Sequence, residues 1–491
     1  MRIKEAAGLM RASFEAGQTL FDKEILGFAI DSRGVAEGEL FFALSPEDYR
    51  RHCFTAASFA DAHDFIPQAF EGGASACVAR AARVAGDASL APFADRLLLV
   101  EDVIEALQML ARGVIDAWGR PVVGITGSAG KTTTKDLTAH VLGHTGRRVL
   151  RSRKNFNNEL GVSLSVLQME SGGARPADFD VAVLEMGMSM PGEIARHCRV
   201  APPDVSVVVN VAPVHLEFMG SVEAIAAGKA QLVEGLKPGG TAVLNADDER
   251  VLAMRAKHSG PVITYGLENK ADVTATEVER AGLGLSRFVL HTPGGSARTE
   301  LPMPGRHNLL NALAAAAVAH RFGISVEEIA EALATAAPSQ MRGEVLRFRE
   351  GFTVVDDSYN SNPKSLLAMA EAIAQGGEEV RRRIVLAGEM RELGADSAAI
   401  HRETGREVAG FGLDILWGVE GHARELVEGA REGGMTGADT AFFENSDEAA
   451  EALAGFVQKG DLVLVKGSRG VHTEKAVGRL KERYEQVMNE E

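Results

Sequence analysis

A glycine-rich run with one lysine lies between a predicted strand and a predicted helix. The run reads Gly-Ser-Ala-Gly-Lys-Thr-Thr-Thr over residues 127–134, and it follows the apolar segment Val122–Thr126. Glycines let backbone amides turn toward phosphate oxygens, and the N-terminus of the following helix adds partial positive charge. Lys131 is placed to reach the β- and γ-phosphates of a nucleotide, and the Thr132 hydroxyl to bind magnesium. The residues predicted to bind the nucleotide here are Gly127, Ser128, Ala129, Gly130, Lys131, Thr132 and Thr133.

The glycine pattern departs from the strict phosphate-loop spacing. That spacing needs a glycine five positions before Gly130, but Ile125 stands there and the nearer glycine is Gly127. The alternative is a strand–turn–helix that is glycine-rich for structural reasons alone. Lysine followed by three threonines at the helix start favours phosphate binding.

Polar residues also follow two further predicted strands. Glu185 ends the strand Val181–Glu185, and His215 follows a strand at 205–210. In one parallel sheet, the carboxyl ends of these strands would meet at the edge that binds ligands. A carboxylate there is placed to hold magnesium, although each residue alone could equally be structural. Lys229 lies on a predicted helix and, taken alone, reads as an ordinary exposed lysine.

The order of predicted strands and helices around these residues indicates an α/β fold with three domains. Apolar strands alternate with helices, which is typical of parallel sheets covered by helices. Residues 1–105 are expected to form a small α/β N-terminal domain. Residues 106–337 are expected to form a central P-loop domain with a parallel sheet and a small antiparallel insert after Tyr265, and residues 338–491 a C-terminal Rossmann-like, doubly wound domain.

Apolar runs and helix-period patterns place the individual elements. Helices are predicted at 104–117, 132–142, 222–232 and 309–322. Strands are predicted at 26–31, 40–44, 76–79, 97–100, 122–126, 181–185, 205–210, 242–245, 271–276, 288–292, 353–356, 383–387, 415–418 and 462–466.

The charge balance argues against a nucleic-acid-binding protein. The net charge is −16, whereas a protein that binds duplexes usually carries a basic face. The densest basic cluster, residues 381–383, is short and follows Glu378 and Glu379, so it reads as a solvated helix end. Any phosphate site must therefore be local, built from backbone amides and a few cations.

The cysteines and the apolar segments indicate a cytoplasmic protein that does not insert into a membrane. Cys53, Cys77 and Cys198 are far apart and show no metal-binding or disulfide spacing, so they read as reduced thiols. The N-terminus carries charges throughout and lacks the apolar core of a signal peptide. The apolar stretch 309–319 is shorter than the roughly 20 residues that span a bilayer.

An ordered set of motifs runs through essentially the whole chain. Its members are residues 31–33, 38–41, 124–134, 155–161, 184–187, Asn210 with His215, Lys229, 244–248, 305–312, 341–344, 356–363, 392–394 and 466–469. This set resembles the Mur ligase family, whose members build the peptide stem of bacterial peptidoglycan. Each motif alone is weak, but their order along one chain is specific.

Three departures from the family pattern stand out. Gly161-Val162-Ser163 stands where the family usually shows Gly-Val-Pro, and Gly388-Glu389-Met390 where it shows Gly-Asp-Met. The expected Asp-Gly-His-Phe stretch is replaced by residues 46–54 followed by 62–65. The N-terminal region therefore looks lengthened at the place where nucleotide-sugar contacts are expected.

The resemblance implies an ATP-dependent ligase that forms an amide bond through an acyl phosphate. The Asn157-Asn158 pair, the 356–360 run and the 392–394 turn are most similar to members that add D-alanyl-D-alanine to UDP-N-acetylmuramoyl-tripeptide. This is the last cytoplasmic step of stem-peptide synthesis, and the family tendency is monomeric. The implied cofactors are ATP, two Mg²⁺ ions and a carbamylated Lys229.

The resemblance also assigns residue roles. The implied catalytic residues are Lys131, Lys229, His215 and Arg342, and the implied metal ligands are Thr132, Glu185, His215 and Lys229. Asn308, Arg342 and Asp357 are expected to join the phosphate loop at the nucleotide, with Asn311 near the adenine or only capping. The implied substrate residues are Ser32, Arg33, Asn157, Asn158, Tyr359, Asn360, Lys466 and Ser468.

Three alternatives remain open from the sequence. One is a sibling ligase that adds another amino acid, such as a folylpolyglutamate-synthase-like enzyme, although the Asp31-Ser32-Arg33 motif argues against that type. The second is a P-loop NTPase that acts as a switch without ligation. The third is an inactive homologue with a binding role. The sequence also leaves open whether the third stem residue of the acceptor is diaminopimelate or lysine.

Overall fold

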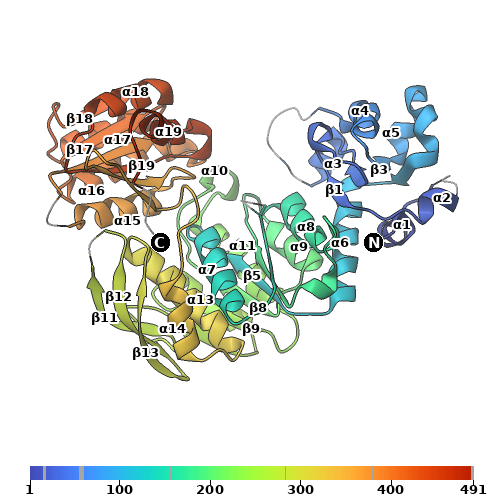
Figure 1. The fold of residues 1–491 in the computed structure, drawn as a ribbon, viewed down its shortest axis with the longest axis horizontal. Coiled ribbons are helices and arrows are strands. Elements are labelled where there is room, and N and C mark those ends of the chain that lie inside the picture. The colour runs from blue at the N-terminus through green and yellow to red at the C-terminus, as the bar shows by residue number, and fades with distance from the viewer. Residues whose placement is uncertain are drawn as a thin grey trace. The chain divides into compact units, whose positions relative to one another are not determined.

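The structure is a computed structural model that describes residues 1–14, 18–52, 54, 60–153, 156–281, 283–377 and 380–487. Helices cover parallel sheets through most of the chain, so the predicted α/β fold is confirmed (Figure 1). The chain forms two compact units of interleaved segments. Unit 1 contains Met1–Thr126, Gly146–Val207 and Gln231–Thr241, and unit 2 contains Gly127–Thr145, Val208–Ala230 and Ala242–Glu491.

A small parallel sheet forms the N-terminal part of unit 1. Its strands are β1 (Gly27–Ala29), β2 (Glu39–Phe42), β3 (Ala76–Arg80) and β4 (Leu97–Val100), in that order. Buried side chains of β2, β3 and β4 pack with those of α4 in one core, which includes Phe41, Ile66 and Leu97. The helices of this part of the chain are α1 (Ile3–Met10), α2 (Gln18–Phe21), α3 (Pro46–Arg51), α4 (Ile66–Glu71) and α5 (Ala81–Ala85).

The long helix α6 (Val103–Trp118) connects this sheet to the central one. Asp102 caps its start by accepting a hydrogen bond from the Glu105 amide, and Gly119 ends it in the left-handed region at φ 66°. Because only glycine adopts that conformation without a steric penalty, the helix stops there and the chain turns into the next strand.

The central sheet has the strand order β10-β9-β8-β5-β7-β6. Every residue of β5, β7, β8 and β9 is buried, as expected for parallel strands covered on both faces. The strands are β5 (Val122–Thr126), β6 (Val149–Arg151), β7 (Val181–Glu185), β8 (Val205–Val208), β9 (Thr241–Asn245) and β10 (Val262–Tyr265). The helices after these strands are α7 (Lys131–His144), α8 (Glu159–Leu167), α9 (Glu193–Val200), α10 (Leu216–Met219), α11 (Val222–Glu234) and α12 (Glu249–Ala253).

The predicted antiparallel insert after Tyr265 is present in unit 2. Its strands are β11 (Thr274–Arg280), β12 (Ser286–Thr292) and β13 (Gly295–Leu301), with a register shift between Thr276 and Glu279. The helices α13 (Arg306–Arg321) and α14 (Val326–Ala334) follow.

The C-terminal sheet, also in unit 2, has the order β14-β15-β19-β16-β17-β18. Only β14 runs antiparallel to its neighbour, and separate apolar cores pack on the sheet's faces, which is a doubly wound arrangement. Its strands are β14 (Glu344–Arg347), β15 (Thr353–Asp357), β16 (Arg382–Gly388), β17 (Ile415–Val419), β18 (Thr440–Phe443) and β19 (Asp461–Lys466). Its helices are α15 (Pro363–Ala374), α16 (Ser397–Ala409), α17 (Ala423–Glu432), α18 (Ser446–Phe456) and α19 (Glu474–Arg483).

The domain boundaries expected at residues 105 and 337 stay predictions, because the two compact units interleave segments from different parts of the chain. Cys77 and Cys198 are free and buried, whereas Cys53 lies outside the described residues. Within the described part of the chain, every helix is too short or too polar to cross a membrane.

Candidate active site

The glycine-rich run forms the turn between β5 and α7, as predicted. Gly130 caps α7 with φ at 79°, a left-handed conformation that favours glycine. A Cβ atom at Gly130 would lie 2.5 Å from Oδ1 of Asn311, so glycine is also required for space. Lys131 donates from Nζ to the Gly127 carbonyl at 2.9 Å, and Thr132 is buried at the first turn of the helix. The helix N-terminus and its lysine therefore meet at one turn, which suits an anionic ligand.

Asn210, which follows β8, holds the first half of this loop. Its Oδ1 accepts hydrogen bonds from the amides of Ser128 and Ala129 at 3.1 and 2.9 Å, and its Nδ2 donates to the Ala129 carbonyl. The Ser128 hydroxyl donates to the Ala212 carbonyl at 3.0 Å. Because both amides donate to Asn210, these hydrogen bonds fix the conformation of the loop. The contact of the two amides with phosphate stays a prediction. The sequence singled out Asn210 only as part of the Mur ligase motif set, without a role.

Two asparagines of α13 brace the phosphate loop from the other side. Asn311 Oδ1 accepts from the Thr134 hydroxyl at 3.2 Å, and Asn311 Nδ2 donates to Asn308 Oδ1 at 3.2 Å. Asn308 Nδ2 donates to the Pro304 carbonyl at 2.8 Å. Both side chains are buried. Asn311 therefore supports the loop, and the contacts of Asn308 with adenine stay a prediction.

The segment after α14 brings Arg342 next to these residues. A Cβ atom at Gly343 would lie 3.9 Å from Asn308 Nδ2, so this turn adjoins the start of α13. The Arg342 guanidinium lies over the ring of Tyr359, 4.0 Å from its centroid, which is a cation–π geometry. The structure thus gathers Arg342, Tyr359 and Asn308, which sequence reasoning had assigned to nucleotide and dipeptide separately.

A buried ion pair links two more of the predicted residues. Lys466, at the end of β19, donates to Asp357 Oδ2 at 2.6 Å and to the Asn360 carbonyl at 2.8 Å. Lys466 is almost fully buried. Asp357 thereby has a fixed orientation at the end of β15. Ser468 lies nearby in sequence, and its hydroxyl accepts from the Arg391 amide at 3.0 Å.

Lys229 is buried, so its interpretation as an exposed lysine is wrong. Only 2% of its surface is accessible, and burial lowers the pKa of its amine well below the usual value, with the nearby charge of Lys131 lowering it further. The lowered pKa favours the unprotonated amine, which is the form that reacts with CO₂ to give a carbamate. The sequence could not show this burial, because only the fold determines which side chains of the helix α11 are covered by other elements.

His215 directly precedes the short helix α10 and has an unusual backbone. Its φ of 53° lies in the left-handed region, as does the φ of 65° at Glu392. The His215 Nδ1 atom contacts the Glu392 carboxylate, and this contact lowers the pKa of Glu392 more than burial raises it. Non-glycine residues in this conformation cost about 1 kcal/mol or more and cluster at functional sites. Sequence reasoning had placed Glu392 in a motif but gave it no role.

Glu185 and the asparagine pair lie together in unit 1. Glu185 stands opposite Ile125 in the register of β7 with β5, close to where the phosphate loop begins. It is 99% buried, and its Oε1 accepts from Asn157 Nδ2 at 2.8 Å. Asn158 caps α8 by accepting from the Gly161 amide at 2.8 Å. Asn155, part of the same motif, lies outside the described residues.

Ser32 and Arg33 lie in the turn after β1. Arg33 pairs with Asp31 at 2.6 Å, and hydrogen bonds from the Arg33 side chain and amide lower the pKa of Asp31 to about 2. The Ser32 hydroxyl donates to Gln68 Oε1 at 3.2 Å. Arg33 is mostly exposed, so its guanidinium faces solvent from the sheet end where ligands of parallel sheets bind.

The predicted metal ligands are distributed over both units. Glu185 belongs to unit 1, whereas Thr132, His215 and Lys229 belong to unit 2. Among the described residues, no group of three or more His, Cys, Asp or Glu side chains forms a metal site. The predicted set contains only two such residues and relies on a hydroxyl and a carbamate for the rest. Those oxygen donors suit Mg²⁺, and the lowered pKa of the buried Lys229 amine fits carbamate formation. The metal site stays a prediction.

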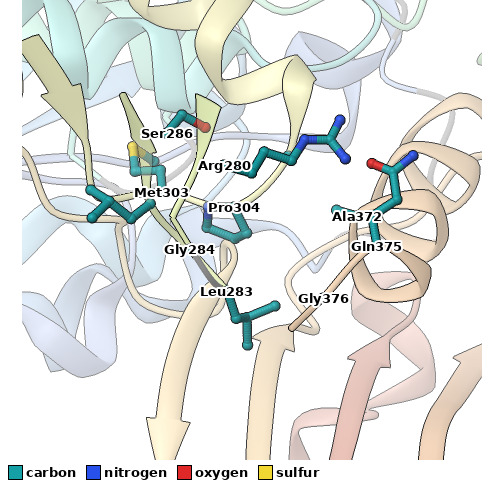
Figure 2. A pocket seen from close by; sticks show the side chains of 11 residues that line it. Arg280, Leu283, Gly284, Ser286, Met303, Pro304, Ala372, Gln375 and Gly376 are labelled. Atoms are coloured by element: carbon teal, nitrogen blue, oxygen red, sulfur yellow. The ribbon is translucent and has the colours of Figure 1, made fainter. Parts of the chain in front are cut away.

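A separate cavity in unit 2 contains none of the predicted site residues. It holds about 340 Å³ of empty space, partly open to solvent, between the antiparallel insert and α15 (Figure 2). Arg280 and Gln375 supply its long polar side chains, and Leu283 and Met303 its apolar ones. Its lining includes Gly305, which directly precedes α13.

Comparisons with known proteins agree with this arrangement. Residues 125–319 match the family model "Mur ligase middle domain", and residues 341–469 match "Mur ligase, glutamate ligase domain". The UDP-N-acetylmuramoyl-tripeptide–D-alanyl-D-alanine ligase of Bacillus subtilis is 33% identical over 455 residues, covering 92% of each chain. The enzyme of the same name from Mycobacterium tuberculosis is 38% identical over 474 residues, covering 89% of this chain and 88% of its own.

Solved structures show the same similarity. A crystal structure of MurF from Acinetobacter baumannii has a TM-score of 0.81 at 28% identity and covers 98% of each chain. MurF ligase from Thermotoga maritima in complex with ADP has a TM-score of 0.78 at 28% identity, covering 93% of this chain and 97% of its own. With matches of this quality along nearly its whole length, the chain belongs to the Mur ligase family.

Proposed function

We propose that this chain is an ATP-dependent ligase that joins D-alanyl-D-alanine to UDP-N-acetylmuramoyl-tripeptide. The proposal rests chiefly on its similarity, along about nine-tenths of its length, to ligases of that name. The phosphate loop, with Lys131 beside the buried Lys229, supplies the chemical basis. ATP is the proposed nucleotide, in line with the relative whose structure contains ADP.

The chemistry needs an activated carboxylate. A carboxylate is a poor electrophile, because oxide is a poor leaving group. Transfer of the γ-phosphoryl group of ATP to the tripeptide carboxylate gives an acyl phosphate and ADP. The amine of the dipeptide then attacks the acyl carbon, a tetrahedral intermediate forms, and phosphate leaves as the amide bond is made.

The first step brings two anions together, so it needs positive charge. Lys131 is proposed to hold the β- and γ-phosphates, and Arg342, fixed over Tyr359, to neutralise charge on the transferred group. Bound Mg²⁺ would supply further positive charge against the charge that develops on the phosphates. Its proposed ligands are Thr132, Glu185, His215 and the carbamate of Lys229. Proposed contacts of the nucleotide itself are Asn308 and Asp357.

Lys229 is proposed to be carbamylated. Burial and the nearby charge of Lys131 both lower the pKa of its amine, which favours the unprotonated form. Addition of CO₂ to that amine forms a C–N bond and releases one proton to solvent, which leaves a carbamate anion. The unfavourable neighbour of Lys131 thereby becomes a favourable one. The modification thus relieves the cost of burying an amine beside a cation.

The two substrates are assigned to different groups of residues. Ser32, Arg33, Asn157 and Asn158 are proposed to bind the UDP-linked acceptor. Tyr359, Asn360, Lys466 and Ser468 are proposed for the dipeptide. The enzyme is proposed to act as a cytoplasmic monomer.

The test measures phosphate release from ATP with purified protein, the UDP-linked tripeptide and D-alanyl-D-alanine, omitting one component at a time. We expect release that depends on both co-substrates and yields a UDP-linked pentapeptide. Hydrolysis that ignores both co-substrates would overturn the ligase assignment in favour of an NTPase. Turnover with a single amino acid in place of the dipeptide would keep the family and change the member.

A further inference from the structure

A cluster of buried charges in unit 1 lies outside all the residues assigned above. Its centre is Glu159, whose carboxylate is 99% buried. Glu159 Oε2 accepts from Gln108 Nε2 at 2.9 Å and pairs with His52 Nδ1 at 2.8 Å, while Oε1 pairs with Arg196. A carboxylate removed from water needs such partners, because burying it unpaired costs several kcal/mol.

His52 connects Glu159 to a second buried carboxylate. Its other ring nitrogen, Nε2, lies 3.2 Å from Oδ1 of Asp102. Both nitrogens thus face carboxylate oxygens, and only the doubly protonated ring can donate to both. Burial alone would lower the pKa of His52, but the bonds to Asp102 and Glu159 outweigh it and raise the pKa to about 9. The ring is therefore an imidazolium at neutral pH.

The position of His52 is fixed by its own helix. His52 follows the last residue of α3, in the lengthened N-terminal segment. Asp48 of α3 is fully buried and accepts from the Val103 amide at 3.1 Å and from Arg80 Nη1 at 2.8 Å. The lengthened segment is thereby tied to the start of α6, and it presents His52 to Glu159.

Glu159 stands directly after the asparagine pair. It is the first residue of α8, and Asn158 caps that helix. Asn157 is held between Glu185, through its side chain, and the Gly187 amide, which donates to its carbonyl at 2.7 Å. Fixing Glu159 thus fixes the end of the loop that carries both asparagines.

We propose that His52 is a positioning residue for the UDP-linked acceptor, because it joins the lengthened N-terminal segment to the start of α8 and so orients Asn157 and Asn158. This proposal rests on the proposed function, in that the asparagine pair is taken to bind the acceptor. His52 itself need not touch substrate. Glu159 keeps Gln108 and Arg196 when His52 is removed, so the variant should still fold.

The kinetic test compares His52→Ala and His52→Gln with Arg50→Ala. Arg50 lies on α3 and pairs only with Glu47 in the described structure, so its removal takes one cation from the same helix without touching the cluster. We expect His52→Ala to raise KM for the acceptor about 10-fold, with kcat and KM for ATP within about twofold. His52→Gln keeps amide donors and should recover part of the effect, while Arg50→Ala should match the wild type. An unchanged KM for the acceptor, or an equal rise in KM for ATP, overturns the proposal.

A second arm is independent of the reaction. The Gly161 and Val162 amides donate to Asn158, so their hydrogen exchange reports the order at the start of α8. We expect faster exchange there in ligand-free His52→Ala, and wild-type exchange in Arg50→Ala. Unchanged exchange overturns the link between His52 and α8. If the wild type shows no ligation while exchange responds as expected, the proposed function has failed and the structural link has not.

Discussion

Lys229 shows how burial can change the chemistry of one side chain. Lys229 is 98% buried beside Lys131, and its pKa lies well below the usual value, since a low-dielectric environment disfavours the protonated amine. The same residue on the surface would be an ordinary cation. The proposed carbamate depends on this lowered pKa, because only the unprotonated amine reacts with CO₂.

Replacing Lys229 by methionine should therefore separate folding from catalysis. We expect Lys229→Met to lower kcat at least about 100-fold, because the site loses an anionic group near the phosphates. The melting temperature should not fall, since an apolar side chain replaces a buried amine of similar length. Phosphate release and thermal unfolding measure the two effects. Lys237→Met, which changes a half-buried lysine paired with Asp204 beyond the same helix, is the control and should keep its activity. Near wild-type turnover of Lys229→Met would contradict the assigned role.

The raised pKa of His52 should make the free energy of unfolding depend on pH. Its pKa is raised to about 9 in the folded chain, whereas an unfolded histidine titrates near ~6.5. The folded state therefore binds the extra proton, and the stabilisation is complete below about pH 6.5 and is lost as pH rises through about 9. Asp102, Glu159, Arg196 and, 4.0 Å from Asp102, Arg51 are the charged groups that face this site.

Urea unfolding of the wild type and His52→Ala at about pH 6 and about pH 10 measures this contribution. The difference between the two proteins should be largest at the lower pH and should nearly vanish at the higher one. Arg50→Ala should follow the wild type at both. A difference that does not change with pH would show that folding leaves the pKa of the ring unshifted.

At the scale of single elements, the phosphate loop depends on the fit between Gly130 and α13. An alanine at Gly130 would meet two penalties, the left-handed backbone and the contact with Asn311 Oδ1 at 2.5 Å. Gly146 has nearly the same φ, 81° against 79°, but no heavy atom lies within 4 Å of its Cβ position. This pair of glycines separates backbone strain from displacement of Asn311.

We expect Gly130→Ala to weaken ADP binding by about 10-fold or more, because Asn311 must leave Thr134 and the loop then shifts. Gly146→Ala should lose about 1 kcal/mol of stability through its backbone alone and bind ADP as the wild type does. Calorimetric titration with ADP and thermal unfolding provide both readouts. Equal losses of affinity in the two variants would mean that Asn311 has no part in shaping the loop.

The elements that the sequence predicted are those with strong local patterns. The buried strands β5 and β7 and the helix α6 were predicted to within a residue or so, since apolar runs and helix-period patterns mark them. Strands such as β6 and β13 were missed. β6 has three residues, and β13 is largely exposed, so neither has an apolar run of its own. Their conformation comes from pairing with neighbours that lie far away in sequence or across a turn.

The motifs of the candidate site could be predicted from the sequence, but the contacts that hold those motifs in place could not. Residue types pointed to Lys131 and Thr132, because phosphate and metal chemistry require those groups, and the family resemblance pointed to the asparagine pair. The contacts of Asn210 with the loop amides join positions more than 80 residues apart, and no local pattern indicates them. Supports of this kind depend on which chain segments the fold brings together.

At the scale of the whole molecule, the residues proposed to bind the nucleotide and those proposed to bind the acceptor belong to different units. The proposed nucleotide residues of the phosphate loop, α13 and β15 all belong to unit 2, whereas Ser32, Arg33 and the asparagine pair belong to unit 1. A ligand that binds only the native state stabilises the part that holds it, by RT ln(1 + [L]/Kd). Each ligand should therefore protect a different set of amides from exchange.

We expect ADP at about 100 times its Kd to slow exchange up to about 100-fold in residues 127–145 and in α13, with smaller changes in β1, β2 and α8. The UDP-linked tripeptide should show the opposite pattern, protecting β1, β2 and the start of α8. Hydrogen exchange followed by mass spectrometry resolves these segments. Gly130→Ala serves as the control, in which the same ADP concentration should give about 10-fold less protection while the acceptor response is kept. The contrary result would be that ADP protects the unit 1 segments as strongly as residues 127–145 and α13. Local opening within each unit would then not explain the exchange rates. The two units would then open as one cooperative structure, and nucleotide binding would be felt by the acceptor residues before any acceptor is present.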